Sequence, residues 1–305
     1  MTETRKPIVV VGSINMDLVA HTRQIPVPGQ TVIGTGFRTT PGGKGANQAV
    51  AAARLGYPVH MVGAVGDDVF SQALLDNLAA SGVHTESVAR VSGPSGVAPI
   101  LVAENGENSI VVVPGANGKM DCAAIDRNAV LIRVAGIVLC QLELPLETVL
   151  HTLALCAEAS VPVILDPAPA APLPDAVFRH ATWFTPNETE AAFYLGSNSA
   201  PEQAARHLLD RGLSGIVLKR GAEGSYIATE ANAAWVKSFP VQPVDTVAAG
   251  DCFNGAFAVA LLEGLAPWAA ARFASAAAAI SVTRPGAQAA MPFRLEVDAF
   301  LAVHG

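Results

Sequence analysis

Charged side chains are scarce in this sequence. Asp, Glu, Lys and Arg make up 15% of its 305 residues, whereas hydrophobic residues make up 51%. The charges are mostly acidic, with 26 acidic and 19 basic side chains and a formal net charge of −7. Nucleic acids and anionic membrane surfaces are bound through basic faces, so this balance argues against both kinds of partner. Disorder is also excluded, because it requires a low content of hydrophobic residues.

Long hydrophobic runs are absent as well. Gly, Pro or a charged residue interrupts each apolar stretch before it reaches the about 18 residues that a membrane-spanning helix needs. The N-terminal segment MTETRKPIVVVGS has no apolar stretch followed by a small-residue cleavage site, so we expect no signal peptide. These absences predict a cytoplasmic protein without a membrane partner.

The sequence has only four cysteines, and none of them forms a C-x-x-C pair or has a histidine at metal-ligand spacing. They are Cys122, Cys140, Cys156 and Cys252. The seven histidines are scattered and form no ligand spacing either. These features argue against a disulfide framework and against a zinc site, and they indicate the reduced thiols of a cytosolic protein.

The sequence does contain a regular alternation of two patterns. Short apolar runs rich in β-branched residues end at turn residues, as buried parallel strands do. Between them lie amphipathic segments; in one, Phe70, Leu74 and Leu78 fall on one helix face behind the potential cap Asp68. The alternation predicts an α/β fold with a doubly wound, mostly parallel sheet flanked by helices. The expected strands span residues 8–11, 59–65, 136–140, 161–165, 183–185 and 215–218.

A further helix is expected after residue 199. Ser199 and Glu202 have the spacing of a capping box, and Pro201 suits the first turn. Apolar pairs then repeat four residues apart, and Gly212 is expected to end the helix.

Two regions interrupt the alternation, because residues 31–37 and 97–113 read as strands with no helix between partners. Asn105-Gly106 lies between two apolar runs of the second region, which is a strong hairpin signal. Pro99 has no backbone N–H to donate and therefore indicates an edge strand. We expect one domain over residues 1–305 with a small projecting β-sheet that serves as a lid. Its strands come from about 14–40 and 97–114, and a uniform doubly wound domain with long loops is the alternative.

The first candidate site is a glycine-rich loop, PGGKGANQA, at residues 41–49. Glycine lets the backbone approach a ligand closely, and the N-terminus of the following helix favours anions or polar oxygens. The loop is not a Walker A motif, because Gly45 rather than Ser or Thr follows Lys44, and it is not a G-x-G-x-x-G after a strand. A glycine-rich turn that only starts a helix is the alternative.

The second candidate is DTVAAGDCFNGA at residues 245–256, where small residues lead to Asp251 and an apolar helix follows. Backbone N–H groups at this helix start can stabilise charge on a transferring phosphoryl group. The Asp251 carboxylate beside them can take a proton from a hydroxyl nucleophile. The alternative is that Asp251 is an ordinary N-cap. The Ala-Ala-Gly approach favours the first interpretation, because it lets a bulky anion come close.

The third candidate, GSINMD at residues 12–17, follows the first expected strand, at the sheet edge where α/β folds bind ligands. Asn15 and Asp17 are two residues apart, so they point to the same side of an extended segment. An amide and a carboxylate on one side suit the recognition of sugar hydroxyls. A turn held by side-chain-to-backbone bonds is the alternative.

The fourth candidate, TPNETE at residues 185–190, follows a short expected strand. Asn187 can cap a helix, and Glu190 at the third helical position can complete a capping box. The functional alternative is a carboxylate that orders water or Mg²⁺ near phosphates, because Mg²⁺ keeps several waters and takes few protein ligands.

Taken in order, these motifs resemble the ribokinase-like sugar kinases, the PfkB family. The resemblance covers nearly the whole chain, from Gly12 to about Pro292. It rests on GSINMD (12–17), PGGKGANQAVAAARLG (41–56), QLELP (141–145), DPAPA (166–170), TPNETE (185–190), DTVAAGDCFNGA (245–256) and TRPGAQ (283–288).

The resemblance implies ATP-dependent phosphorylation of a sugar hydroxyl, with D-ribose giving ribose 5-phosphate and ADP. Asp251 matches the general base for the 5-hydroxyl, and Ala248, Ala249 and Gly250 match the anion hole. The positions that match sugar contacts are Asn15, Asp17, Gly42, Gly43, Lys44, Asn47 and Glu143, together with Asp251. Fructose, 2-deoxyribose or a nucleoside as acceptor is the alternative within the family. A non-catalytic sugar- or nucleotide-binding protein is the alternative outside it.

The same resemblance implies a set of nucleotide and metal contacts. ATP contacts are expected at Asn187, Lys219, Gly221, Gly224, Gly250 and Ser275. Mg²⁺ is expected near Glu190, held through water. An activating K⁺ ion is expected in the loop environment of Asp245, Val247, Ser281, Arg284 and Gly286. The lid is expected to form the contact of a homodimer.

Three residues depart from the family's pattern. Ala290 stands where a serine hydroxyl would contribute beside the cation. Lys219 replaces a small hydroxyl residue, so its ammonium group either reaches ATP phosphates or is solvated. Asp166 replaces an asparagine, for which the sequence offers no physical account.

Overall fold

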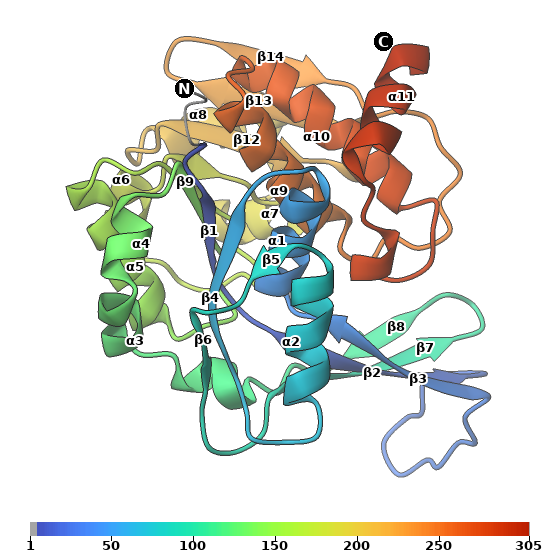
Figure 1. Cartoon of the computed structure of the whole chain (residues 1–305). Coiled ribbons are helices and arrows are strands. Elements are labelled where there is room, and N and C mark those ends of the chain that lie inside the picture. Colours follow the sequence, from blue (N-terminus) through green and yellow to red (C-terminus); the bar gives the residue numbers. More distant parts are fainter. Residues whose placement is uncertain (1–4, 305) are drawn as a thin grey trace.

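The structure is a computed structural model that describes residues 5–304. Its central sheet is built from β1 (Ile8–Val11), β4 (Val59–Val65), β5 (Val83–His84), β6 (Val88–Arg90), β9 (Ile137–Cys140), β10 (Val163–Leu165), β11 (Trp183–Phe184), β12 (Gly215–Lys219), β13 (Ser225–Thr229) and β14 (Ala233–Val236). The strand order is β14-β13-β12-β11-β10-β9-β1-β4-β5, with β6 beside β4 (Figure 1). Neighbours from β12 to β5 pair in parallel. The pairs β12–β13 and β13–β14 are antiparallel, so β13 alone runs against the other strands of this path. The predicted mostly parallel sheet is therefore confirmed.

Helices cover both faces of this sheet. They are α1 (Lys44–Arg54), α2 (Ser71–Ala80), α3 (Cys122–Arg127), α4 (Ala129–Arg133), α5 (Leu146–Glu158), α6 (Asp175–His180), α7 (Glu188–Leu195), α8 (Pro201–Leu209), α9 (Ala249–Leu262), α10 (Pro267–Ser281) and α11 (Arg294–His304). Short 3₁₀ turns η1 (Gly115–Lys119), η2 (Gly221–Glu223) and η3 (Gln288–Ala290) join some of them. None of the helices described between residues 5 and 304 is long and apolar enough to cross a membrane.

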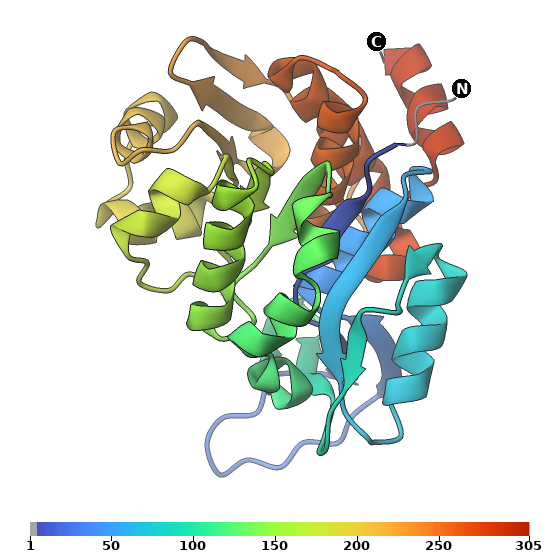
Figure 2. The same cartoon turned by 60° about the vertical axis from the view of Figure 1, so that its left-hand side comes forward.

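The layering follows from the side chains of the strands. Successive side chains of a strand point to opposite faces, so β1 contributes to both cores. Ile8 and Val10 pack in the core that α1, α9 and α10 cover. Val9 and Val11 pack in the other core, under α3, α5, α6 and α8. The rotated view shows the sheet between these two helical layers (Figure 2).

A second, smaller sheet projects from the main body (Figure 1). It consists of β3 (Gly36–Gly42), β2 (Asn15–Thr22), β7 (Gly96–Ala103) and β8 (Asn108–Ile110), in that order. β7 and β8 form the hairpin predicted from Asn105-Gly106, and Gly106 has a φ of +87° in its turn. The expectation of a projecting lid sheet is confirmed.

The prediction that Pro99 marks an edge strand is wrong, because β7 lies between β2 and β8. β8 ends at Ile110, and beyond it Val111 N–H donates to the carbonyl of Pro99 at 3.1 Å. Beyond this point the antiparallel pairing continues, because Val97 and Val113 exchange two hydrogen bonds of 3.0 and 2.9 Å. The N–H that proline lacks would face Val111, so Pro99 interrupts the regular pairing at one position of an interior strand.

Two element boundaries also differ from expectation. Residues 31–35 lie outside the strands. β3 spans Gly36–Gly42, so it begins later than expected and ends within the glycine-rich loop. The capping box expected at Ser199 is not formed. Ala200 is the N-cap of α8 and offers no side chain to its N–H groups, while Pro201 occupies the first turn as predicted. Proline at that position already removes one of the donors that a cap would satisfy.

The fold brings the candidate motifs to one edge of the main sheet. In parallel strands the carboxyl ends lie at the same edge, and ligands bind there. The chain leaves β1 at Gly12, directly against Gly45 in the first turn of α1; a methyl group on Gly12 would lie 2.7 Å from the Gly45 Cα atom. Only glycine permits this approach, which sets the start of α1 against the end of β1.

Candidate active site

Asp251 lies at the centre of the site. Helix α9 begins at Ala249, and its N-cap is Ala248, whose φ of +60° turns the backbone into the helix. Asp251 is therefore in the first turn and is not the N-cap, so the capping alternative is wrong. Its carboxylate is buried and accepts hydrogen bonds from Asn47 Nδ2 at 2.9 Å and Gln48 Nε2 at 3.1 Å.

β2 and the start of α1 form the side of the site on which the sugar contacts are expected, called the acceptor side below. Asn15 and Asp17 both lie on β2, and both are buried. Asn15 Oδ1 accepts a hydrogen bond from Asn117 Nδ2 at 2.7 Å, and Asn15 Nδ2 donates to Glu143 Oε2 at 3.5 Å. Glu143 Oε2 also accepts from Ser13 Oγ at 2.5 Å and from the backbone N–H of Lys44 at 3.3 Å. One carboxylate thus ties the end of β1 to the glycine-rich loop.

Gly42 and Gly43, two of the three glycines of that loop, have no room for a side chain. A methyl group on Gly42 would overlap the Asp17 carboxylate. Gly43 has a φ of +90°, and a methyl group there would lie 2.7 Å from the backbone nitrogen of Asn15. The N-cap position of α1 is Gly43, so close approach rather than a side-chain cap starts this helix.

Four charged groups perturb one another in this cluster. Burial, followed by repulsion from Glu143 and Asp251, raises the pKa of Asp17 to about 7. Burial also raises the pKa of Asp251 to about 6, although the Lys44 charge opposes this shift. For Lys44, burial favours the neutral amine, but the nearby carboxylates, Asp251 first, outweigh it and raise the pKa above its usual value. Lys44 is therefore a permanent cation between groups that titrate near neutral pH.

A layer of amide side chains behind these residues was not predicted from the sequence. Gln48 Oε1 accepts from Gln141 Nε2 at 2.8 Å, and Gln288 Nε2 donates to Asn47 Oδ1 at 3.0 Å. Gln141 directly follows the buried strand β9, and Gln48 lies on the Ala-rich helix α1. Gln288 begins the 3₁₀ turn η3. A buried amide in an apolar segment was the signal that could have found them, since buried polar groups need partners.

The nucleotide side begins at α7, where the predicted capping box is present. Asn187 Oδ1 accepts from the N–H of Glu190 at 2.9 Å, and Glu190 Oε2 accepts from the N–H of Asn187 at 2.7 Å. Burial and the Asp166 charge raise the pKa of Glu190. The structural role of this motif is thus filled, and the role of Glu190 toward Mg²⁺ remains a prediction.

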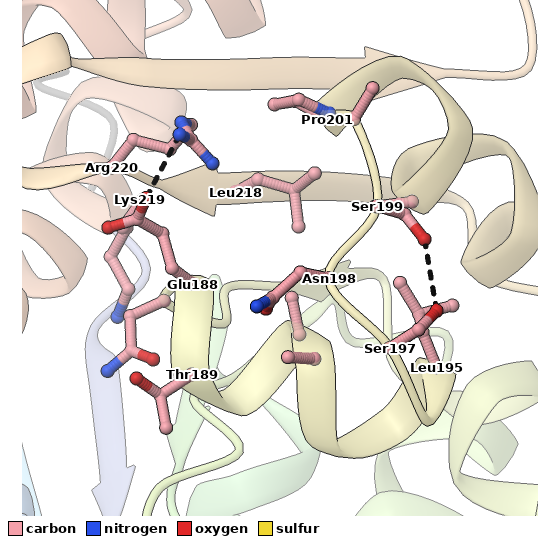
Figure 3. Close-up of a pocket in the computed structure, with 15 residues that line it drawn as sticks. Glu188, Thr189, Leu195, Ser197, Asn198, Ser199, Pro201, Leu218, Lys219 and Arg220 are labelled. Carbon is pink, nitrogen blue, oxygen red and sulfur yellow. Dashed lines mark hydrogen bonds and ion pairs between the residues drawn. The ribbon is translucent and has the colours of Figure 1, made fainter.

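A cavity of about 620 Å³ opens between α7, α8 and the end of β12 (Figure 3). Asn187, Glu188, Lys219 and Arg220 are among the residues that line it. The close-up shows the ion pair between Arg220 and Glu188, whose charged atoms are 3.0 Å apart. The side chain of Lys219 turns away from this pair. Its Nζ atom lies 3.0 Å from Asp166 Oδ1, so the ammonium group is paired rather than solvated, and its contact with ATP phosphates remains a prediction.

The remaining expected nucleotide positions lie farther along the chain. Gly221 opens η2 and Gly224 closes it with a φ of +104°, where a methyl group would overlap the carbonyl of Val236. This turn needs glycine for its own geometry. Ser275 is buried in α10, and its role is a prediction.

The loop expected to hold a monovalent cation is partly assembled. Asp245 Oδ1 accepts from Val247 N at 3.0 Å, and Asp245 Oδ2 accepts from Gly286 N at 2.9 Å. The Ser281 hydroxyl donates to the carbonyl of Ala278 at 2.8 Å. Arg284 directs its guanidinium to Glu296 instead of the loop. The structure therefore brings Asp245, Val247 and Gly286 together and leaves the Arg284 side chain outside.

The comparison with known families settles the relationship. Residues 5–294 match the model of the pfkB family carbohydrate kinases. The chain belongs to this family.

Full-length relatives within the pfkB family share much of the sequence. A ribokinase from Bacillus subtilis is 47% identical over 296 residues, which cover 97% of this chain and 99% of the relative. A ribokinase from Haemophilus influenzae is 40% identical with the same coverage. A deoxyribokinase from Salmonella typhi is 38% identical, again over 97% of this chain and 99% of the relative.

Solved pfkB structures share the fold over the same length. Ribokinase from Thermotoga maritima is 40% identical and superposes with a TM-score of 0.91, covering 97% of this chain and 99% of that one. Arabidopsis thaliana ribokinase, complexed with ribose and ATP, is 35% identical with a TM-score of 0.91, covering 98% and 99%. The predicted family and fold are confirmed.

Proposed function

We propose that this protein is an ATP-dependent ribokinase, which transfers the γ-phosphoryl group of ATP to the 5-hydroxyl of D-ribose. The products are ribose 5-phosphate and ADP. The observation that carries the proposal is Asp251, a buried carboxylate in the first turn of α9, between the anion-hole residues and the polar face of β2. The full-length ribokinase relatives support the choice of sugar.

Asp251 is the general base in this proposal. Its two oxygens accept from Asn47 and Gln48, which fix the direction of the carboxylate. As the 5-hydroxyl proton passes to Asp251, the hydroxyl oxygen forms a bond to the γ-phosphorus and the bond to the β–γ bridging oxygen breaks. A pKa of about 6 keeps the carboxylate ionised at neutral pH while leaving it basic enough to accept a proton.

The anion hole is the second part of the proposal. Ala248, Ala249 and Gly250 start α9, and the first N–H groups of a helix have no carbonyl partner within it. Such donors stabilise negative charge that develops on the transferring phosphoryl group. The absence of bulky side chains at these positions leaves room for the phosphoryl oxygens.

Lys44 and the sugar contacts form the third part. The cationic side chain of Lys44 offsets the charge that accumulates between Asp251 and the phosphoryl group. Asn15, Asp17 and Glu143 present amide and carboxylate oxygens that suit several sugar hydroxyls at once. The remaining proposed sugar contacts are Gly42, Gly43 and Asn47.

We assign the nucleotide and its Mg²⁺ to the other side of Asp251. The proposed ATP contacts are Asn187, Lys219, Gly221, Gly224, Gly250 and Ser275. Mg²⁺, when bound, neutralises phosphate charge during transfer. Glu190 fits a water-mediated role, because Asn187 occupies each of its oxygens with one donor and leaves further lone pairs for water.

Further proposals concern K⁺, assembly and location. Activation by K⁺ is supported by Asp245, which draws Val247 and Gly286 into one loop. A homodimer through the lid is supported by exposed apolar side chains, such as Phe37 on β3 at 69% and Ile33 in the loop before β3 at 86%. A cytoplasmic location is supported by four cysteines that are all free thiols.

A coupled assay of ADP release tests the function. We expect D-ribose to support far faster turnover than 2-deoxyribose, fructose or adenosine, with K⁺ raising the rate. The similarity to a deoxyribokinase makes 2-deoxyribose the main competitor. Faster turnover with any of the other three acceptors would refute the assignment to ribose.

A further inference from the structure

A buried ion pair between Lys219 and Asp166 lies at the carboxyl edge of the main sheet. No role has been proposed so far for Asp166. Lys219 ends β12, and Asp166 follows β10. Lys219 Nζ lies 3.0 Å from Asp166 Oδ1, and the two side chains are only 13% and 3% exposed. These are two of the positions at which the sequence departs from the family's pattern, so the two departures are one structural feature.

The pair connects the two halves of the site. Asp166 Oδ2 accepts a hydrogen bond from Gln48 Nε2 at 3.1 Å, and the same nitrogen donates to Asp251 Oδ1 at 3.1 Å. A single amide group therefore joins Asp166 to the general base. At the other end, a methyl group on Gly250 would lie 3.3 Å from Lys219 Nζ, so the ammonium group borders the anion hole.

Stability does not account for such a pair. Removing two charges from water costs more than their attraction returns in many proteins, and neutral replacements of a buried pair are often neutral or stabilising. The same surroundings strengthen the interaction of the ammonium group with a phosphoryl group, because the local dielectric is low. A held ammonium group also loses less freedom when it binds a ligand, because its partner already orders it.

We propose that Lys219 binds the ATP phosphates at the edge of the anion hole and that Asp166 is the positioning residue that holds both this ammonium group and the Gln48 amide. This inference rests on the proposed function. Negative charge spreads over the oxygens of the phosphoryl group during transfer, and Lys219 supplies a second cation, besides Lys44, at the edge of the anion hole. Asp166 thereby links nucleotide binding to the orientation of Asp251.

The arrangement also predicts an electrostatic signature at Asp251. The charged groups that act on this carboxylate are Lys44 on α1, Asp17 on β2 and Asp166 after β10. The Asp166 charge raises the pKa of Asp251, so its removal lowers that pKa. The acidic limb of the pH–rate profile would then move to lower pH, which a purely structural role of Asp166 would not cause.

The test compares Lys219→Thr, Lys219→Arg, Asp166→Asn and the double variant Lys219→Thr/Asp166→Asn. The double variant leaves no unpaired buried charge, so it separates function from folding. Arg133→Thr/Glu158→Gln is the matched control, because it removes an exposed pair of 3.1 Å between α4 and α5. For each protein we would measure the melting temperature, the Kd of ATP without sugar, and kcat and KM for both substrates.

We expect the double variant to melt near the wild-type temperature but to lose about tenfold or more in kcat/KM for ATP, since one charged donor is removed from the phosphoryl group. Lys219→Thr should show a similar loss, and Lys219→Arg should recover part of it. The KM for sugar should change little. Asp166→Asn should lower kcat and move the acidic limb to lower pH.

Wild-type kcat and ATP affinity in the double variant would overturn the inference. An unmoved acidic limb in Asp166→Asn would overturn the link to Asp251. The Kd of ATP is measured without sugar, so this measurement tests the inference separately from the proposed function. A wild-type protein that binds ATP but does not phosphorylate ribose would contradict only the proposed function.

Discussion

The acceptor side and the nucleotide side of Asp251 are built in different ways. On the acceptor side, residues from β2, α1, η1 and the segment after β9 bond to one another, as in the contacts of Asn15 with Asn117 and Glu143. On the nucleotide side, the side chains of Asn187 and Glu190 bond mainly to each other. The acceptor side is thus held by contacts among distant segments. The capping box of the nucleotide side is local, and the Lys219–Asp166 pair joins that side to Gln48.

The difference has a chemical reason. A neutral sugar offers only hydroxyl groups, so its recognition depends on polar groups that are already positioned when it arrives. Mg²⁺ and ATP carry strong charges and bind helix starts and backbone N–H groups. Apart from Asp166, which links the two sides, we therefore expect substitutions on the acceptor side to change mainly the sugar kinetics. Substitutions of Asn187 or Glu190 should change mainly the dependence on ATP and Mg²⁺.

The largest effect is expected where the two sides meet. Asp251→Asn keeps the shape of the side chain but removes the base, so kcat should fall by about 10²–10⁴-fold while the Kd values of sugar and ATP stay near those of wild type. Steady-state assays and calorimetry would measure this. Asp76→Asn, in α2 and exposed, is the control. Near-normal turnover of Asp251→Asn would refute the base.

A substitution in β3 tests the rigidity of the acceptor side. Gly42→Ala places a methyl group against the Asp17 carboxylate, so kcat/KM for sugar should fall by about 10–100-fold, as expected for misplaced contacts. The KM for ATP should hardly change. Gly36→Ala, at the other end of β3, is the matched control, because the nearest atom would be 3.8 Å from its methyl group. Equal behaviour of the two variants would contradict a preformed acceptor side.

Glu190→Gln tests the nucleotide side. Glutamine can keep the capping box of α7, so the helix should remain, whereas the charge near Mg²⁺ is lost. We expect about a tenfold increase in the Mg²⁺ concentration needed for half-maximal rate, and an unchanged KM for sugar. A titration with Mg²⁺ at saturating ATP measures this. An effect on the sugar KM instead would break the division into two sides.

The smallest effect concerns pH. Asp251 acts as a carboxylate, so kcat/KM should fall as pH drops through about 6, the pKa of this group. Asp17, with a pKa of about 7, is expected to take up a proton first and to widen the acidic limb. Asp17→Asn should therefore narrow the acidic limb of the pH–rate profile, which is the pH range over which kcat/KM falls. A rate that stays constant down to pH 5 would contradict the assignment of Asp251.

The sequence predicted the main sheet because buried parallel strands such as β1 and β4 are continuous apolar runs between turn residues. It also predicted the hairpin, since Asn105-Gly106 demands a tight turn. The position of Pro99 in an interior strand could not be predicted, because the pairing of β7 with both β2 and β8 is a tertiary arrangement that local sequence does not show. The prediction that Ser199 caps α8 was wrong, because local spacing does not reveal whether a serine side chain turns toward the helix that follows it.

Within the site, motifs identified the residues that approach ligands, such as Asp251 and Asn15. Their supporting partners were not predictable, because Asn117 and Gln288 come from distant segments and have no motif of their own. The Lys219–Asp166 pair shows why. In the sequence, Lys219 and Asp166 are two separate departures from the family's pattern. The strand order places β10 and β12 on either side of β11, and this arrangement brings the two side chains together.

The most direct test of the account is the identity of the product. Wild-type protein would be incubated with ATP, Mg²⁺ and ¹³C-labelled D-ribose, and the product would be analysed by ¹³C and ³¹P NMR. Transfer to the 5-hydroxyl, with Asp251 as its base, predicts coupling of the phosphorus to carbon 5 and an equal amount of ADP. Phosphorus coupled to another carbon, or ADP formed without a sugar phosphate, would contradict the account.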